Sequence, residues 1–223
     1  MPACSIFVAT FLEIMVNIDL AKMQQIADAL ADEGWFAQPD FLTEELASAL
    51  LNITRQNRDS DAFRRAGIGT GTSFQLNREI RGDSIYWISR HPQEKALIQW
   101  VELMNQVREG INKELFLGLR DLEMHMAIYP PGTHYQRHLD QFNDRSNRVL
   151  SVVLYLTPDW QAGMGGELVI YRNPKEPVIV EPKAGTFVCF LSDQIEHEVL
   201  TTHIERYSIT GWMLRKPIGL GFL

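Results

Sequence analysis

The chain has 223 residues, of which 45% are hydrophobic, and its formal net charge is −7 at pH 7. This length and composition suit a globular domain with a hydrophobic core of its own and exclude a disordered chain. The acidic balance disfavours a protein that grips the phosphate backbone of nucleic acid, so we expect no nucleic-acid partner.

The first segment, residues 1–19, is apolar, but no positively charged stretch precedes it and Glu13 interrupts it. These features do not fit a signal peptide or a membrane span. We expect residues 1–19 to be a disordered segment or an over-extended start, and residues 20–223 to form a single domain. The chain's two cysteines show neither a disulfide framework nor a zinc-binding spacing, which favours a reduced, cytoplasmic location.

Helical spacing of apolar side chains predicts three helices, over residues 20–33, 43–56 and 93–116. Gly34 ends the first helix, as a glycine in the left-handed conformation commonly does. Thr43 is the predicted N-cap of the second helix. The helical part of the domain therefore covers about residues 20–120.

A glycine-rich loop, residues 66–80, separates the second and third helices, and we expect it to be functional. From about residue 121 the chain changes to short strands with turns between them. The predicted strands are LEMHMAIY, HYQRHLD, RVLSVVLYL, GELVIY, VIV, GTFVCF, HEVL and RYSITGWML. Such a series predicts a mainly β, α+β fold, with a barrel or jelly roll over about 121–215 and helices on one side.

Two residues of one predicted strand, His138 and Asp140, are candidate metal ligands. Side chains at positions i and i+2 of a strand point to the same face, so both could bind one ion. A buried histidine beside a surface aspartate would show the same pattern. His197 supplies a third ligand, and two histidines with one carboxylate are typical of non-haem Fe(II) oxygenases. Zinc can use the same ligands.

Arg206 narrows the interpretation. By strand alternation it shares one face with Ser208, Thr210 and Trp212. A guanidinium inside a barrel can bind a carboxylate through two hydrogen bonds, and the Thr210 hydroxyl could contact the same carboxylate. The alternative is a surface arginine on an edge strand.

Two tyrosines could line the same cavity. Tyr155 ends an apolar strand, and its hydroxyl needs a partner, either core backbone or the carboxylate of a cosubstrate. Tyr129 precedes the first candidate ligand and shares a face with His125 and Ala127.

Six segments occur in a characteristic order: IRGDSIYWI (80–88), YPPGTHYQRHLDQF (129–142), VVLYLTPDW (152–160), GGELVIY (165–171), FLSDQIEHEV (190–199) and RYSITGW (206–212). Together they resemble the prolyl 4-hydroxylase superfamily of 2-oxoglutarate oxygenases, and most of all the hypoxia-type prolyl hydroxylases and their bacterial relatives. The resemblance covers about residues 64–213. It implies a double-stranded β-helix core, supported by N-terminal helices, and a dioxygenase that uses Fe(II), 2-oxoglutarate and O2, with ascorbate in a supporting role.

The resemblance also implies a role for each candidate residue. His138, Asp140 and His197 match the iron ligands, and Arg206 matches the arginine that binds the C5 carboxylate of 2-oxoglutarate. The other matches are Tyr155 and Thr210 to hydrogen-bonding helpers, Tyr129, Leu168 and Trp212 to pocket-lining positions, Arg148 to a residue near the substrate mouth, and Arg81 and Asp83 to the hinge of a loop that closes over a proline-containing peptide.

The implied reaction is hydroxylation of a prolyl residue in a cytosolic protein, with conversion of 2-oxoglutarate and O2 to succinate and CO2. A translation factor such as elongation factor Tu is one candidate substrate suggested by the bacterial relatives. Two alternatives stay open: a hydroxylase of a free amino acid, and a catalytically silent barrel that binds a ligand or senses iron. We expect a monomer that associates with no membrane.

Overall fold

The structure is a computed structural model and describes residues 17–67, 79–141 and 147–215. The helices are α2 (Leu20–Glu33), α3 (Glu44–Asp59) and α4 (Lys95–Leu115). The strands are β1 (Trp35–Gln38), β2 (Arg64–Arg65), β3 (Ser84–Trp87), β4 (Asp121–Tyr129), β5 (Tyr135–His138), β6 (Arg148–Tyr155), β7 (Leu168–Arg172), β8 (Lys175–Val180), β9 (Phe187–Leu191), β10 (His197–Val199) and β11 (Arg206–Leu214). Each predicted helix and strand is present at nearly its predicted place.

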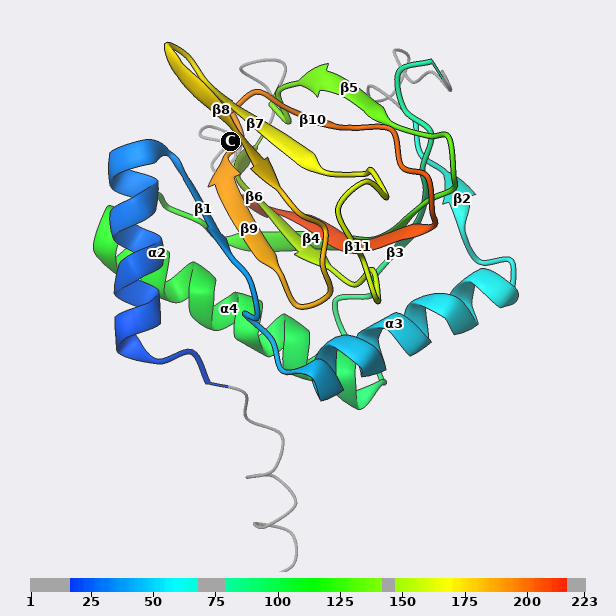
Figure 1. The fold of residues 1–223 in the computed structure, drawn as a ribbon. Coiled ribbons are helices and arrows are strands. Elements are labelled where there is room, and N and C mark those ends of the chain that lie inside the picture. The colour runs from blue at the N-terminus through cyan, green and yellow to red at the C-terminus, as the bar shows by residue number, and fades with distance from the viewer. Residues whose placement is uncertain (1–16, 68–78, 142–146, 216–223) are drawn as a thin grey trace, which may run out of the picture.

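Two sheets form the core. A seven-stranded sheet has the order β1-β9-β6-β11-β4-β3-β2, and a four-stranded sheet has the order β5-β10-β7-β8. Figure 1 shows the three helices along one side of the larger sheet, with the smaller sheet on the other side. This arrangement agrees with the predicted jelly-roll core and its helical support.

The helix ends follow the sequence signals. Gly34 has a φ of 77° and its N–H donates to the Leu30 carbonyl, which ends α2 at its predicted residue. The Thr43 hydroxyl accepts from the Leu46 N–H and begins α3. That helix continues three residues beyond its predicted end, to Asp59.

The two faces of the larger sheet have different surroundings. On β4, β6 and β11, one set of alternating side chains packs with the helices in a single hydrophobic core. It includes Met124, Met126, Ile128, Leu150, Val152, Leu154, Tyr207, Ile209 and Met213. The other set faces the smaller sheet, where Ala127, Tyr129, Val153 and Tyr155 join a second cluster with Leu168 and Ile170. The interior between the two sheets is therefore separate from the core that packs the helices.

Strand pairing sets which inward side chains are neighbours. β11 lies between β4 and β6, with every pair antiparallel. Arg206 is opposite Tyr129 on β4. Thr210 lies between His125 on β4 and Val153 on β6. The predicted common faces on β4 and β11 are thus present, and they meet in one interior.

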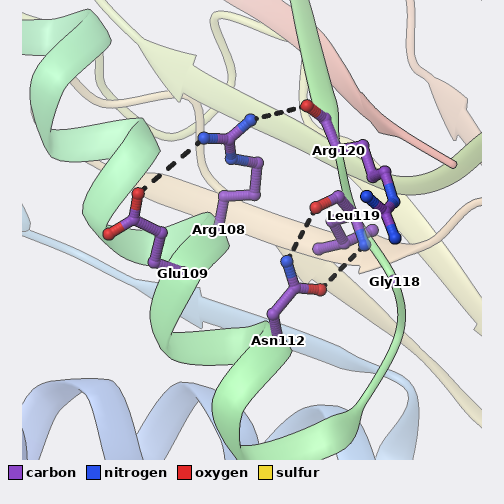
Figure 2. A pocket seen from close by; sticks show the side chains of 6 residues that line it. All are labelled: Arg108, Glu109, Asn112, Gly118, Leu119 and Arg120. Atoms are coloured by element: carbon purple, nitrogen blue, oxygen red, sulfur yellow. Dashed lines mark hydrogen bonds and ion pairs between the residues drawn. The ribbon is translucent and has the colours of Figure 1, made fainter. Parts of the chain in front are cut away.

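The junction between α4 and β4 is held by a side-chain clamp. The Asn112 amide donates to the Leu119 carbonyl at 2.7 Å and accepts from the Leu119 N–H at 2.8 Å. Figure 2 shows this pair of bonds beside Arg108, which donates to the Arg120 carbonyl at 2.9 Å. A surface hollow of about 400 Å³ lies here. None of its lining residues is a predicted site residue.

Some predictions concern residues beyond the described ranges. Residues 1–16 of the N-terminal segment and residues 68–78 of the glycine-rich loop are not among the described residues. Across the ranges that are described, no helix combines the length and the apolar character that a membrane crossing requires.

Replacing Asn112 with alanine should lower the free energy of unfolding by about 1–3 kcal/mol, because a half-buried N–H and carbonyl would lose their partner. Urea denaturation followed by circular dichroism measures the change. Glu114→Ala, at an exposed position of the same helix, is the control and should stay within about 0.5 kcal/mol of the wild type. Equal stability of the two variants would show that the clamp is dispensable.

Candidate metal and cosubstrate site

His138, Asp140 and His197 come together in the interior. Their ligand atoms lie within 4.8 Å of one another, and all three side chains are buried. Asp140 Oδ1 is 3.6 Å from His138 Nε2, and its Oδ2 is 3.8 Å from His197 Nε2. Pairing of β5 with β10 places the two histidines opposite each other. β5 ends at His138, so Asp140 reaches the group from the bend that follows and not by strand alternation.

The backbone orients both imidazole rings. His138 Nδ1 lies 2.7 Å from the Gln136 carbonyl, and His197 Nδ1 lies 3.1 Å from the Ile195 carbonyl. A carbonyl oxygen only accepts, so each Nδ1 carries the proton and each Nε2 presents a lone pair toward Asp140. This is how metal-binding histidines are commonly fixed.

A buried serine holds the carboxylate. Ser151 Oγ donates to Asp140 Oδ2 at 2.6 Å and lies 2.8 Å from Ser192 Oγ. Burial opposes ionisation of Asp140, but the neighbouring His197 and His138 and the hydrogen bond from Ser151 hold its pKa well below the usual range. Burial lowers the pKa of His197 to about 4. One carboxylate and neutral imidazoles are the states that a divalent metal requires, so this donor set fits Fe(II).

Tyr135 packs against the first ligand, although the sequence did not single it out. Its ring stacks on that of His138, with centroids 3.7 Å apart and planes at 21°. An irregularity in the pairing of β5 with β10 brings these residues to one side, contrary to simple alternation. The Arg81 guanidinium lies over the Tyr135 ring, with its Cζ 4.8 Å from the ring centroid, and pairs with Asp83 at 2.6 Å. The predicted loop hinge is thus a buried ion pair next to the ligands.

Arg206 is only 2% exposed and lies in the same interior, beside Tyr129 and Tyr155. Its Nε donates to the Gly166 carbonyl at 2.8 Å, and its Cζ lies 4.8 Å from the Tyr129 ring and 4.9 Å from the Tyr155 ring. A Cβ on Gly166 would come within 2.8 Å of Arg206 Cδ, so a glycine leaves the space that the arginine occupies.

No carboxylate among the described residues lies within ion-pair distance of the Arg206 guanidinium. A buried cation without an anion is strongly unfavourable. The arrangement therefore suits an anionic ligand that the described residues do not supply.

Further polar atoms face this interior without a hydrogen-bond partner among the described residues. They are the Tyr155 hydroxyl, Ser208 Oγ, Trp212 Nε1 and both ring nitrogens of His125. Buried polar groups are ordinarily bonded, so such a group of atoms on β4, β6 and β11 indicates a polar ligand. Burial, together with the charges of Arg81 and Arg148, lowers the pKa of His125 to about 3, so this ring is neutral.

The remaining predicted residues lie around the same interior. Leu168 is buried on β7, and Thr210 is half-buried on β11. Trp212 is 4% exposed and lies beneath Arg148, whose Cζ is 3.4 Å from the Trp212 ring centroid and whose guanidinium pairs with Glu123 at 3.3 Å. Trp87 lies beside them and is 49% exposed.

Sequence reasoning missed Ser151 and Tyr135. Ser151 had a usable signal, because it is the only polar residue of the apolar run 149–154 and shares a strand face with Tyr155. Tyr135 had none, since its position depends on the pairing irregularity.

Several known proteins are similar to this chain in sequence and fold. Residues 124–214 match the 2OG-Fe(II) oxygenase superfamily. The chain is 28% identical over 208 residues to the mouse (Mus musculus) protein named prolyl hydroxylase EGLN3, and the alignment covers 89% of this chain and 86% of that protein.

Two solved structures are similar over nearly the whole chain. A crystal structure of a Pseudomonas putida prolyl-4-hydroxylase is 41% identical, with a TM-score of 0.80, and the match covers 87% of this chain and 99% of that one. A Trichoplax adhaerens prolyl hydroxylase, in complex with a peptide fragment of the hypoxia inducible factor oxygen degradation domain, is 26% identical. Its TM-score is also 0.80, covering 87% of this chain and 89% of that chain.

Replacing Ser151 with alanine should weaken metal binding about 10- to 100-fold, because Asp140 would lose the hydroxyl that orients it. Calorimetric titration of the metal-free protein with Mn(II) measures the affinity. Ser151→Thr keeps the hydroxyl and should bind nearly as well as the wild type. Equal losses in both variants would assign the effect to packing.

The metal-free protein should lose stability as the pH falls from about 6.5 towards 4. The unfolded chain takes up protons on His125 and His197 near their ordinary pKa of about 6.5. The folded chain resists protonation down to a pKa of about 3 at His125 and about 4 at His197. Each group should contribute a slope of roughly 1 kcal/mol per pH unit in this window. Urea denaturation across the window measures the slope, which His125→Phe should reduce; an unchanged slope would contradict this.

Proposed function

Since this chain belongs to the 2OG-Fe(II) oxygenase superfamily, as its 41% identity to the Pseudomonas putida enzyme over 87% of the chain establishes, we propose that it hydroxylates a prolyl residue of a protein partner. The reaction would convert 2-oxoglutarate and O2 to succinate and CO2. Ascorbate would support it by keeping the iron reduced.

One observation carries the cosubstrate assignment: the Arg206 guanidinium is buried in the same interior as the His138–Asp140–His197 group and has no carboxylate partner among the described residues. A dicarboxylate such as 2-oxoglutarate supplies the missing anion at one end. Its other end would then lie toward the metal ligands. The Tyr155 hydroxyl, whose hydrogen-bonding capacity is unused within the described chain, is placed to bind the same carboxylate.

The protein's part in the reaction is to hold and orient. Iron, when bound, supplies the oxygen activation that side chains cannot perform. His138, Asp140 and His197 would hold it through three positions and leave the others open. Apolar side chains of the second cluster, among them Leu168 and Val188, surround this interior and keep bulk water away.

The exposed Trp87, close to the buried Trp212, favours a peptide substrate. Trp87 is 49% exposed and lies 6.3 Å, centroid to centroid, from Trp212, and Arg148 covers the Trp212 ring. Exposed aromatic rings are the surfaces on which prolyl segments dock in other proteins. The Trichoplax relative was solved with a peptide bound, which supports the same kind of partner.

The proposed partner is defined by its class and compartment. A cytosolic protein is expected, and a translation factor such as elongation factor Tu is one candidate. A reduced compartment agrees with Cys189, a buried cysteine that forms no disulfide.

The test combines turnover with a change at the anchor. The wild type, with Fe(II) and 2-oxoglutarate, should form succinate and add one oxygen to a proline of a cellular protein, identified by mass spectrometry after restoring the gene to a deletion strain. Arg206→Met should raise the dissociation constant of 2-oxoglutarate by on the order of 100-fold or more, because a buried charge pair is lost. Its affinity for Mn(II) should match the wild type and serves as the control.

Other outcomes would select the alternatives. Oxygen transfer to free proline or lysine, and to no protein, would identify a small-molecule hydroxylase. An iron-loaded wild type that consumes no 2-oxoglutarate with any substrate would indicate a silent, ligand-binding barrel.

A further inference from the structure

His125 is a buried histidine that the proposed reaction has not yet used. It lies in the middle of β4 with 1% of its surface exposed, on the face that looks into the interior. Its pairing neighbours are Thr210 on β11 and Trp87 on β3. Neither ring nitrogen has a hydrogen-bond partner among the described residues.

Two aromatic rings confine the imidazole. The Trp87 ring meets it edge-on with centroids 5.0 Å apart, and the Trp212 ring lies 5.3 Å away at 37°. The Trp212 ring offers no acceptor, and its own Nε1 lacks a partner among the described residues. The packing therefore holds the imidazole in place and leaves its hydrogen-bonding capacity to something in the interior.

An apolar side chain would fill this position at lower cost. The residues on either side of His125, Met124 and Met126, are methionines that face the helical core, so β4 readily takes unbranched apolar residues. A neutral ring with two unsatisfied nitrogens is instead the kind of buried polar group that ordinarily has a partner. A histidine at this position therefore indicates that an atom of a bound ligand forms a hydrogen bond with the ring.

The register tells which part of a ligand His125 would meet. Ser151, which bonds the candidate metal ligand Asp140, is opposite Trp212 in the ladder. His125 is opposite Thr210, which on β11 is two residues from Trp212 and four residues from Arg206. The imidazole thus lies on the metal side of the interior, away from the guanidinium.

We propose that His125 donates a hydrogen bond to the keto-acid end of 2-oxoglutarate, the end opposite the carboxylate held by Arg206. This inference rests on the proposed function, which places 2-oxoglutarate in this interior. Arg206 then fixes the distal carboxylate and His125 fixes the reacting end, so the chain holds the cosubstrate at both ends. His125 acts here as a cosubstrate-binding residue and not as a metal ligand.

The test measures binding without turnover. Full-length protein is loaded with Mn(II), and the dissociation constant of 2-oxoglutarate is measured by calorimetry for the wild type, His125→Met and His125→Gln. His125→Met should bind about 10- to 100-fold more weakly, the usual range for losing a hydrogen bond to a charged group. His125→Gln keeps an N–H donor and should recover much of the affinity. His125→Phe is a second apolar variant if the methionine variant does not fold.

A second readout is the visible charge-transfer band of the anaerobic Fe(II)–2-oxoglutarate complex. Removing a hydrogen bond to the keto acid should shift the band in His125→Met, and His125→Gln should bring it back toward the wild-type position. Pentanoate, followed by ligand-observed NMR, is the matched probe. It offers one carboxylate to Arg206 and no keto acid, so its affinity should be the same in the wild type and His125→Met.

Met126→Leu is the matched control variant, because it lies on the same strand and faces the helical core. It should leave both the affinity and the band unchanged. Wild-type affinity and an unshifted band in His125→Met and His125→Phe would overturn this inference alone. A wild type that binds Mn(II) but no 2-oxoglutarate would overturn the proposed function and this inference together.

Discussion

The alternation of side chains on β4, β6 and β11 is the constraint on which the rest of the structure depends. Each strand has one face in the helical core and one face in the interior between the sheets. On β11, Tyr207 and Ile209 face the helical core, while the alternating residues Arg206 and Ser208 face the interior between the sheets. A shift of one residue would exchange the two sets. The extensive apolar packing of the helices therefore also fixes which polar groups line the interior.

The interior separates its charges along these strands. The Asp140 carboxylate belongs to the group with the two imidazoles, and the Arg206 guanidinium lies apart from it, between two tyrosine rings. Ser151 and the nearby imidazoles stabilise the carboxylate, whereas the guanidinium has no carboxylate partner among the described residues, which is costly in a medium of low dielectric constant. A divalent cation at the first place and a carboxylate at the second satisfy both. The buried guanidinium, which is costly without an anion, thus becomes a source of ligand selectivity.

Much of this could be predicted from the sequence, because the signals were local. Helical spacing with caps such as Thr43 predicted the helices, and period-two alternation predicted the inward face of β11. The missed contacts are non-local. The stacking of Tyr135 on His138 depends on irregular pairing with β10, and the bond from Ser151 to Asp140 joins residues 11 apart across a loop. No pattern within a single strand encodes such partners.

Trp212 links the part of the interior proposed for the cosubstrate to the part proposed for the substrate. One side of its ring faces His125 and another carries the Arg148 guanidinium, with Trp87 nearby. A peptide that displaced Arg148 or pressed on Trp87 would act on a ring that contacts His125 directly. Substrate choice and cosubstrate orientation would then be coupled through one side chain, and changes at Trp212 would affect both.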